Sequence, residues 1–142
     1  MPTIIRNILA VIVGAVLGGI LNMAIVMVGP MVIPPPAGVD MTTVEGLKAA
    51  MPLLEAKHFI APFLAHALGT LVGALVTYLI AASYKTVLGY VVGVLFLIGG
   101  ISACFLIPAP AWFMVLDLVV AYIPTAWLGI LIGRSIQRKN TV

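Results

Sequence analysis

The sequence predicts an all-α membrane protein, with four transmembrane helices packed as a bundle in a single domain over residues 1–142. Two observations lead to this fold class. Hydrophobic residues make up 63% of the chain and charged residues 8%, whereas about 25% of an average soluble domain is charged. The apolar residues also form four runs, each long enough to cross roughly 30 Å of hydrocarbon. Because lipid satisfies no free backbone group, we expect each run to be helical.

The positions of the four runs define the expected spans. They are about residues 8–28, 59–82, 86–107 and 111–133. The first run is longer than the roughly 7–15 apolar residues of a signal peptide, and no Ala-x-Ala site follows it, so we expect it to remain in the protein. Trp112, Tyr84 and Tyr90 fall near span ends, where aromatic side chains meet the membrane interface.

The distribution of basic residues predicts how the spans are oriented. Helix ends alternate between the two sides of a membrane, so one side carries five basic residues and the other carries two. The five are Arg6, Lys85, Arg134, Arg138 and Lys139, and the two are Lys48 and Lys57. Basic residues gather in cytoplasmic segments. This predicts that both termini are cytoplasmic and that the loop over residues 29–58 is external or periplasmic.

The external loop combines a proline-rich segment with a short helix. Three consecutive prolines, residues 34–36, predict a stiff extended strut. Thr42 and Glu45 have the spacing of a capping box. The apolar residues after Thr42 recur at helical intervals: Val44, Leu47, Met51 and Leu54. We therefore expect an amphipathic helix on the membrane surface over residues 43–51, with Pro52 kinking it or starting a second helix.

Each span contains one Gly-x-x-x-Gly pair, which lets two helix backbones approach closely. The eight glycines are Gly14, Gly18, Gly69, Gly73, Gly89, Gly93, Gly129 and Gly133. We expect them to pack the bundle, and a spare glycine face would also support a homo-oligomer or a larger membrane complex. Bulkier residues in the outer half of the spans predict a bundle that opens outward around a cavity.

Three polar residues fall at a common depth in the spans. Asn22, His66 and Asp117 each lie six or seven residues from the outer end, which is roughly 9–11 Å below the outer surface at 1.5 Å per residue. Ser102 and Cys104 lie slightly shallower. These five residues predict a polar pocket or ion path open to the periplasm, with His66 and Asp117 as a proton-exchanging pair. The alternative is a polar clasp that only sets helix register.

Catalytic and cofactor motifs are missing from the sequence. No Ser-His-Asp elbow, His-Glu-x-x-His motif or phosphate loop occurs, so we assign no catalytic residue and expect no metal or cofactor. Haem is disfavoured because only His66 is deep enough, and His58 is interpreted as an interfacial residue. A methionine stripe at Met23, Met27 and Met31 leaves a Cu(I) path as a minor alternative to ordinary apolar packing. A net charge of +3 without a basic stripe excludes nucleic-acid binding.

Three segments resemble those of small, uncharacterised bacterial four-helix integral membrane proteins. They are residues 32–40 (VIPPPAGVD), residues 57–70 (KHFIAPFLAHALGT), and residues 112–117 with 122–124 (WFMVLD and YIP). The resemblance covers nearly the whole chain and implies a bacterial inner-membrane location, but it brings no functional residues with it. Length and span number are also similar to those of small multidrug transporters. Their embedded first-helix Glu is absent here, since Asn22 is the polar residue of that span.

Three functions remain open on this basis. A non-enzymatic accessory or assembly subunit, in contact with the lipid bilayer, is favoured by the small size and the helix-packing motifs. The alternative is a small proton-coupled transporter or channel that uses His66 and Asp117. A third hypothesis is a membrane enzyme acting on a lipid or quinone, in which the pair would be a general base without a recognisable nucleophile.

Overall fold

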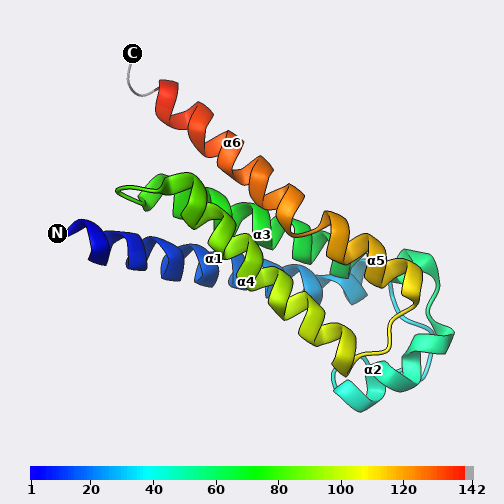
Figure 1. Cartoon of the computed structure of the whole chain (residues 1–142). Helices are drawn as coiled ribbons and strands as arrows, with labels where there is room; N and C mark the ends of the chain where they lie inside the picture. Colours follow the sequence, from blue (N-terminus) through cyan, green and yellow to red (C-terminus); the bar gives the residue numbers. More distant parts are fainter. Residues whose placement is uncertain (140–142) are drawn as a thin grey trace.

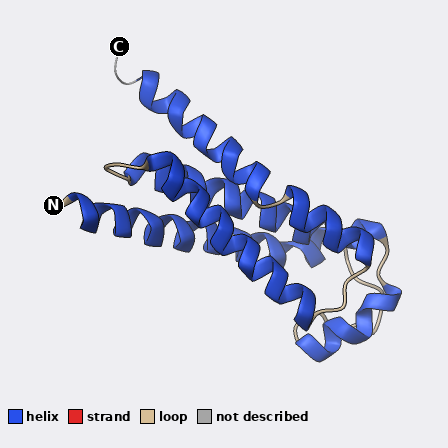
Figure 2. Cartoon of the chain, in the orientation of Figure 1, coloured by secondary structure: helices blue, strands red, loops and turns tan. Residues whose placement is uncertain are grey.

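The computed structural model describes residues 1–139, and within that range the chain forms helices and loops without a β-strand (Figures 1 and 2). The longer helices are α1 (Thr3–Val32), α3 (Ile60–Ile80), α4 (Lys85–Leu106), α5 (Ala111–Val120) and α6 (Ile123–Lys139). Short helices between α1 and α3 are α2 (Val44–Ala50) and the 3₁₀ turns η1 (Met51–Leu53) and η2 (Ala56–Phe59).

Four helical segments are long and apolar enough to cross a membrane. They are α1, η2 together with α3, α4, and α5 together with α6. The prediction of four membrane-spanning segments is thereby confirmed, and the chain is a small multi-pass helical membrane protein. Figure 1 shows the start of α1, the turn between α3 and α4, and the last turn of α6 at one end of the bundle, which we call the terminal end. The segment over residues 33–59 covers the opposite end, which we call the loop end.

α1 is longer than predicted, and the loop is correspondingly shorter. The helix continues through Pro30 to Val32, so the loop begins at Ile33 and the predicted start at Gly29 is wrong. A proline inside a helix removes one backbone hydrogen bond. The helix tolerates this loss near its end, where the Ile33 amide still donates to the Gly29 carbonyl at 2.9 Å. The last turn of α1 therefore reaches into the loop end.

The fourth span is divided, although the sequence predicted one continuous helix. A turn at Ala121 and Tyr122 separates α5 from α6. Pro124 accounts for the break, because it lacks the N–H that a continuous helix needs, yet it is tolerated in the first turn of α6. The Thr125 hydroxyl donates to the carbonyls of Ala121 at 2.6 Å and Tyr122 at 3.0 Å, which adds hydrogen bonds across the break. α6 then continues to Lys139.

The loop end begins with an extended segment. The three consecutive prolines have no helical structure, and Gly38 follows them with a φ of 82°, a left-handed value that glycine adopts without strain. Thr43 is the N-cap of α2, because its Oγ1 accepts a hydrogen bond from the Gly46 amide at 3.0 Å. The predicted cap at Thr42 is wrong, since the Thr42 hydroxyl donates to Asp40 at 2.6 Å instead.

α2 passes directly into the single turn of η1, which contains Pro52. The missing N–H of a proline does not break a helical bond at the first positions of a helix, so the chain tightens here instead of continuing α2. Ala50 at the end of α2 is 1% exposed. The short helices thus pack against the bundle at the loop end.

α1 and α3 approach each other through two pairs of glycines. A Cβ placed on Gly14 would lie 2.5 Å from the carbonyl oxygen of Gly73, and a Cβ on Gly69 would lie 2.8 Å from the carbonyl oxygen of Gly18. Any side chain at these positions would push the two backbones apart. The contact is a backbone-to-backbone contact of the kind that small residues permit in membranes.

The other predicted glycines also contact neighbouring helices. Gly89 and Gly93 of α4 face Ile130 and Ala126 of α6, and Gly129 and Gly133 of α6 face Leu71 and Tyr78 of α3. All eight glycines therefore contact another helix of the same chain. The bundle uses each of these glycine pairs internally, so the condition for self-association through a spare glycine face is not met by them.

Candidate functional site

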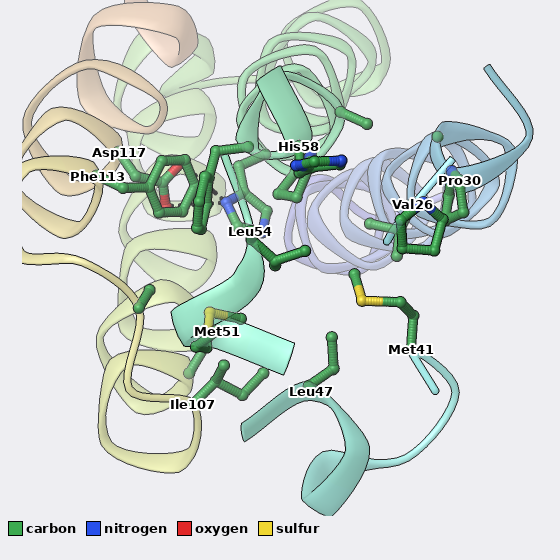
Figure 3. A pocket seen from close by; sticks show the side chains of 18 of the residues that line it. Val26, Pro30, Met41, Leu47, Met51, Leu54, His58, Ile107, Phe113 and Asp117 are labelled. Carbon is green, nitrogen blue, oxygen red and sulfur yellow. Dashed lines mark hydrogen bonds and ion pairs between the residues drawn. The ribbon is translucent and has the colours of Figure 1, made fainter. Parts of the chain in front are cut away.

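A cavity with a volume of about 240 Å³ lies at the loop end, between α1, α3, α4 and α5 and under the short helices. We call it the pocket. The labelled side chains of Figure 3 surround it, with Val26 and Pro30 on one side, Phe113 and Asp117 on the opposite side, and Leu47 and Met51 between them. The polar side chains that line it are those of Lys57, His58, His66 and Asp117. The remaining lining is apolar, as is usual for a site that binds an apolar molecule.

His66 of α3 and Asp117 of α5 form a hydrogen-bonded pair at the wall of the pocket. Nδ1 of His66 lies 2.9 Å from each carboxyl oxygen of Asp117. The hydroxyl of Tyr122 donates to Oδ2 of the same carboxyl group at 3.0 Å. Asp117 is 3% exposed and Tyr122 2% exposed, so the carboxyl group is removed from solvent but satisfied by two donors. We call these three residues the His–Asp–Tyr cluster.

The cluster determines which atom His66 presents to the pocket. Because Nδ1 donates to a carboxyl group, the proton of a neutral imidazole lies on Nδ1 and Nε2 is left as an acceptor. The imidazole of His66 stacks on the ring of Tyr122, with centroids 5.7 Å apart and an angle of 25°. Its side chain is 25% exposed, and within residues 1–139 no group forms a hydrogen bond to Nε2. His66, which lines the pocket, therefore has an acceptor atom without a partner among residues 1–139.

Tyr122 was not among the residues selected from the sequence. It belongs to the turn that Pro124 creates, and in a continuous helix it would be rotated about 140° away from Asp117 after five residues at 100° per residue. The break changes this direction and turns the hydroxyl back toward the carboxyl group. Pro124 was therefore the sequence signal for a break that could bring Tyr122 to Asp117. A proline alone, however, does not specify the direction in which the chain turns.

Cys104 lines the pocket from α4, but Ser102 does not. Ser102 is exposed, and its hydroxyl donates to the Ile98 carbonyl of its own helix at 2.8 Å. The reason is rotation, because Gly100, Ala103 and Cys104 share the inner face of α4, whereas Ser102 is on the other side.

Asn22 also lies outside the pocket. Its Cβ is 2.9 Å from the position that a Cβ on Gly69 would take, and its Oδ1 is buried without a hydrogen-bond partner among the described residues. Asn22 is one turn deeper than Val26, at the level where α1 and α3 are in backbone contact and leave no space. Common depth alone therefore does not bring it to His66 and Asp117.

His58 joins two parts of the loop end at the mouth of the pocket. Its Nδ1 accepts from the Glu55 amide at 2.9 Å, and its Nε2 lies 3.1 Å from the carbonyl oxygen of Pro34. The imidazole thereby connects η2 to the proline segment. The sequence suggested only an interfacial role, because a contact across 24 residues is not visible in local spacing.

Aromatic rings connect η2 to α5 beside the pocket. Phe59 is 5% exposed, and its ring lies 4.8 Å from that of Phe113 and 5.5 Å from that of Trp112, centroid to centroid. Aromatic pairs at these distances are favourable in tilted and edge-on arrangements. This cluster holds the start of α3 against the start of α5, so that His66 and Asp117 face each other one to two turns further on.

The methionine stripe of α1 does not join the pocket. Met23, Met27 and Met31 are 56%, 66% and 80% exposed, and they point outward from α1. Within the described chain, no group of three His, Cys, Asp or Glu side chains is arranged to hold a metal ion. The Cu(I) alternative required the stripe to approach Cys104 and His66, and this arrangement is not found.

A second hollow lies on the outer side of α1 and α3. This groove has a volume of about 340 Å³ and is lined only by apolar residues, including Ala24, Val28 and Leu64. It shares Gly29, Ile33 and Ala61 with the pocket. These residues form the wall between the groove and the pocket, and Gly29 and Ala61 are in contact there.

Compared with known protein families, curated proteins and solved structures, the chain shows no significant match. The functional interpretation therefore depends on the geometry of the pocket.

Proposed function

We propose that this protein is a non-enzymatic accessory or assembly subunit of a bacterial inner membrane, and that it holds a membrane-derived apolar molecule in the pocket. The observation that carries the proposal is the His–Asp–Tyr cluster at the wall of an otherwise apolar cavity. Binding sites for small molecules are generally apolar hollows with a few convergent polar groups that orient the ligand. The pocket has this composition.

A purely structural role for the cluster explains less. An Asp in the centre of a membrane helix costs about 2.5–3.5 kcal/mol on insertion scales, and such residues commonly mark functional sites. A polar clasp would satisfy Asp117 with His66 and Tyr122, but it would not require a cavity next to the imidazole. The cavity, together with an Nε2 atom that no residue among 1–139 binds, favours a binding site.

The orientation that we propose places the pocket on the periplasmic side. The terminal end carries Arg6, Lys85, Arg134, Arg138 and Lys139, and the four acidic residues of the chain are all elsewhere. The positive-inside rule then makes both termini cytoplasmic. In a Cys104→Ser background, Ala37→Cys should react with a membrane-impermeant maleimide added to intact cells, and Ser135→Cys should react only after lysis. The reverse pattern would contradict this orientation.

Native mass spectrometry of the gently extracted protein tests both the bound molecule and the larger complex. Wild-type protein should carry an adduct of lipid-like mass and should also appear in an assembly with another protein. Ala103→Phe, which fills the pocket from α4, should lose the adduct. Ile101→Phe is the matched control, because Ile101 is on the same helix but is 41% exposed on its outer surface. Wild-type protein free of any adduct would contradict the binding proposal.

A proton-coupled transporter is the second candidate, and the pairing of His66 with Asp117 is the observation that favours it. Such a transporter would also need a conformation in which the pocket opens toward the terminal end, where glycine contacts now hold α1, α3, α4 and α6 together. Proton uptake by liposomes that contain the protein, lost in Asp117→Asn, would support the transporter over the accessory subunit. Liposomes that remain proton-tight would exclude it.

A further inference from the structure

Building on the proposed binding role of the pocket, we propose that its ligand is an uncharged amphipath whose head carries a hydroxyl group. The hydroxyl donates to Nε2 of His66, and the apolar part of the ligand lies against the apolar lining of the pocket. The proposal rests on the charge of the cluster, the acceptor that it presents, and the size and apolar lining of the pocket.

The charge of the cluster disfavours an anionic head. Asp117 is the acidic member of the cluster, and neither a Lys nor an Arg side chain among residues 1–139 bonds to it, so the cluster offers no fixed positive charge. Lys57 is the cationic lysine at the pocket, and it forms an ion pair with Glu55 at 3.2 Å on the exposed side. A carboxylate or phosphate head inside the pocket would thus be desolvated without a counter-charge.

A cationic head is disfavoured for a different reason. The Asp117 side chain is 5% exposed and both of its oxygens are already bonded by His66 and Tyr122. A ligand cation therefore cannot reach the carboxyl group directly. It would meet only the imidazole, which lies between the pocket and the carboxyl group. An uncharged head is the remaining class.

The acceptor at Nε2 selects a hydroxyl group among uncharged heads. Nδ1 carries the proton because it donates to Asp117, and Nε2 then requires a donor. An ether or ester of the same shape supplies no donor and leaves Nε2 unsatisfied. Losing one such buried hydrogen bond weakens binding by about tenfold or more.

The size of the pocket indicates where the chain of the ligand goes. A volume of about 240 Å³ is below the roughly 300–1,000 Å³ of pockets that enclose a drug-sized molecule. The pocket can thus enclose a head and only part of a chain. The apolar groove on the outer side of α1 and α3 does not extend this space, because Gly29 and Ala61 are in contact between the two hollows. We therefore expect the remainder of a long chain to lie outside the pocket.

Cys104 provides the readout for a test, because it is the single cysteine of the chain and it lines the pocket. A ligand in the pocket should slow alkylation of Cys104 by N-ethylmaleimide in the full-length protein in nanodiscs. Dodecan-1-ol and decylhydroquinone are the hydroxyl probes, and their methyl ethers and dodecanoate are the matched compounds without a neutral hydroxyl. Protection should require about tenfold lower concentrations of the hydroxyl probes.

The two hydroxyl probes distinguish the sources of this chemistry. A preference for decylhydroquinone would indicate a hydroquinone-like ring beside Phe113, and a preference for dodecan-1-ol would indicate an aliphatic lipid alcohol. His66→Phe keeps a ring but removes Nε2, so the preference for hydroxyl over ether should disappear. If this variant does not fold, the comparison of each hydroxyl probe with its methyl ether in wild-type protein still tests the head group. Equal protection of Cys104 by a hydroxyl probe and its ether would overturn the assignment of a hydroxyl head.

If no probe protects Cys104 and native mass spectrometry finds no adduct, the binding role itself fails, which is a different outcome from a lost hydroxyl preference.

Discussion

The terminal end and the loop end of this bundle contain similar apolar helices but pack in opposite ways. From Gly14 to Gly18, α1 touches the backbone of α3, and a Cβ at these positions would overlap carbonyl oxygens. Two to four turns further along α1, Val26 and Pro30 face a cavity of about 240 Å³. Small residues bring helices into contact, whereas prolines, a broken helix and bulky side chains hold them apart. The difference locates the site within an otherwise closely packed chain.

The hydrogen bonds of polar side chains also differ between the terminal end and the loop end. At the terminal end, Oδ1 of Asn7 accepts from the amides of Ala82 and Ser83 at 2.9 and 3.2 Å, and Nε of Arg6 donates to the Ile80 carbonyl at 2.7 Å. These bonds satisfy the backbone of the turn between α3 and α4. At the loop end, the polar side chains bond to each other and leave an acceptor facing a hollow. The first arrangement stabilises the fold, and the second can accept a ligand.

The largest effect should come from the closely packed end. Gly18→Leu places a side chain against the Gly69 backbone, which cannot yield as a flexible side chain would. It should destabilise the protein by about 3 kcal/mol, the upper part of the range for overpacked cores. Gly19→Leu is a matched control on the next residue, since nothing lies within 4 Å of its Cβ position. Thermal unfolding in detergent measures both, and equal loss in the two variants would contradict the packing argument.

A smaller effect is expected at the loop end. Asp117→Asn keeps the shape but loses the charge, and it should cost about 1–2 kcal/mol of stability, as interhelical hydrogen bonds do in model membrane peptides. It should also weaken ligand retention, whereas Gly19→Leu should leave retention unchanged. In a double-mutant cycle with His66→Phe, the losses should be non-additive because each change removes the same bond. Additive losses would show that the two side chains act independently.

Tyr122→Phe should have a weaker effect than Asp117→Asn. It removes the hydroxyl that donates to Oδ2 at 3.0 Å but retains the ring that stacks on His66. The expected cost is about 0.6 kcal/mol, the average for an interhelical hydrogen bond in a membrane protein. The pocket should still retain its ligand, because Nδ1 of His66 remains bonded to Asp117. Complete loss of ligand would instead assign the Tyr122 hydroxyl a direct role in binding.

The smallest effect should come from the exposed start of α2. The Thr42 hydroxyl and amide donate to Asp40 and lower the pKa of its carboxyl group below the ordinary value of 3.8. The charged form is therefore the one that stabilises the turn. This contribution is present above pH 3.8 and is lost as the pH falls through the lowered pKa. The protection of α2 amides from hydrogen exchange, relative to the intrinsic exchange rate at each pH, should decrease over that acidic range in wild-type protein but not in Asp40→Asn.

The sequence by itself determined that the chain is a helical membrane protein with four spans, because apolar runs of membrane length can satisfy their backbone only as helices. Residue spacing also determined depth. His66 and Asp117 were expected at one level because each residue adds about 1.5 Å along a helix, and the structure joins them by hydrogen bonds of 2.9 Å. Depth and the small-residue spacing are local properties, so they can be read from one segment at a time.

The tertiary structure decided which side chains meet. Asn22 shares the depth of His66 but lies where α1 touches α3, and Ser102 is rotated out of the pocket that Cys104 lines. Tyr122 reaches Asp117 only because the helix breaks before Pro124, and His58 reaches Pro34 across the loop. These contacts depend on the relative rotation of separate helices and on the direction of turns. Rotations and turn directions are set by packing among all segments at once, so no single segment of sequence specifies them.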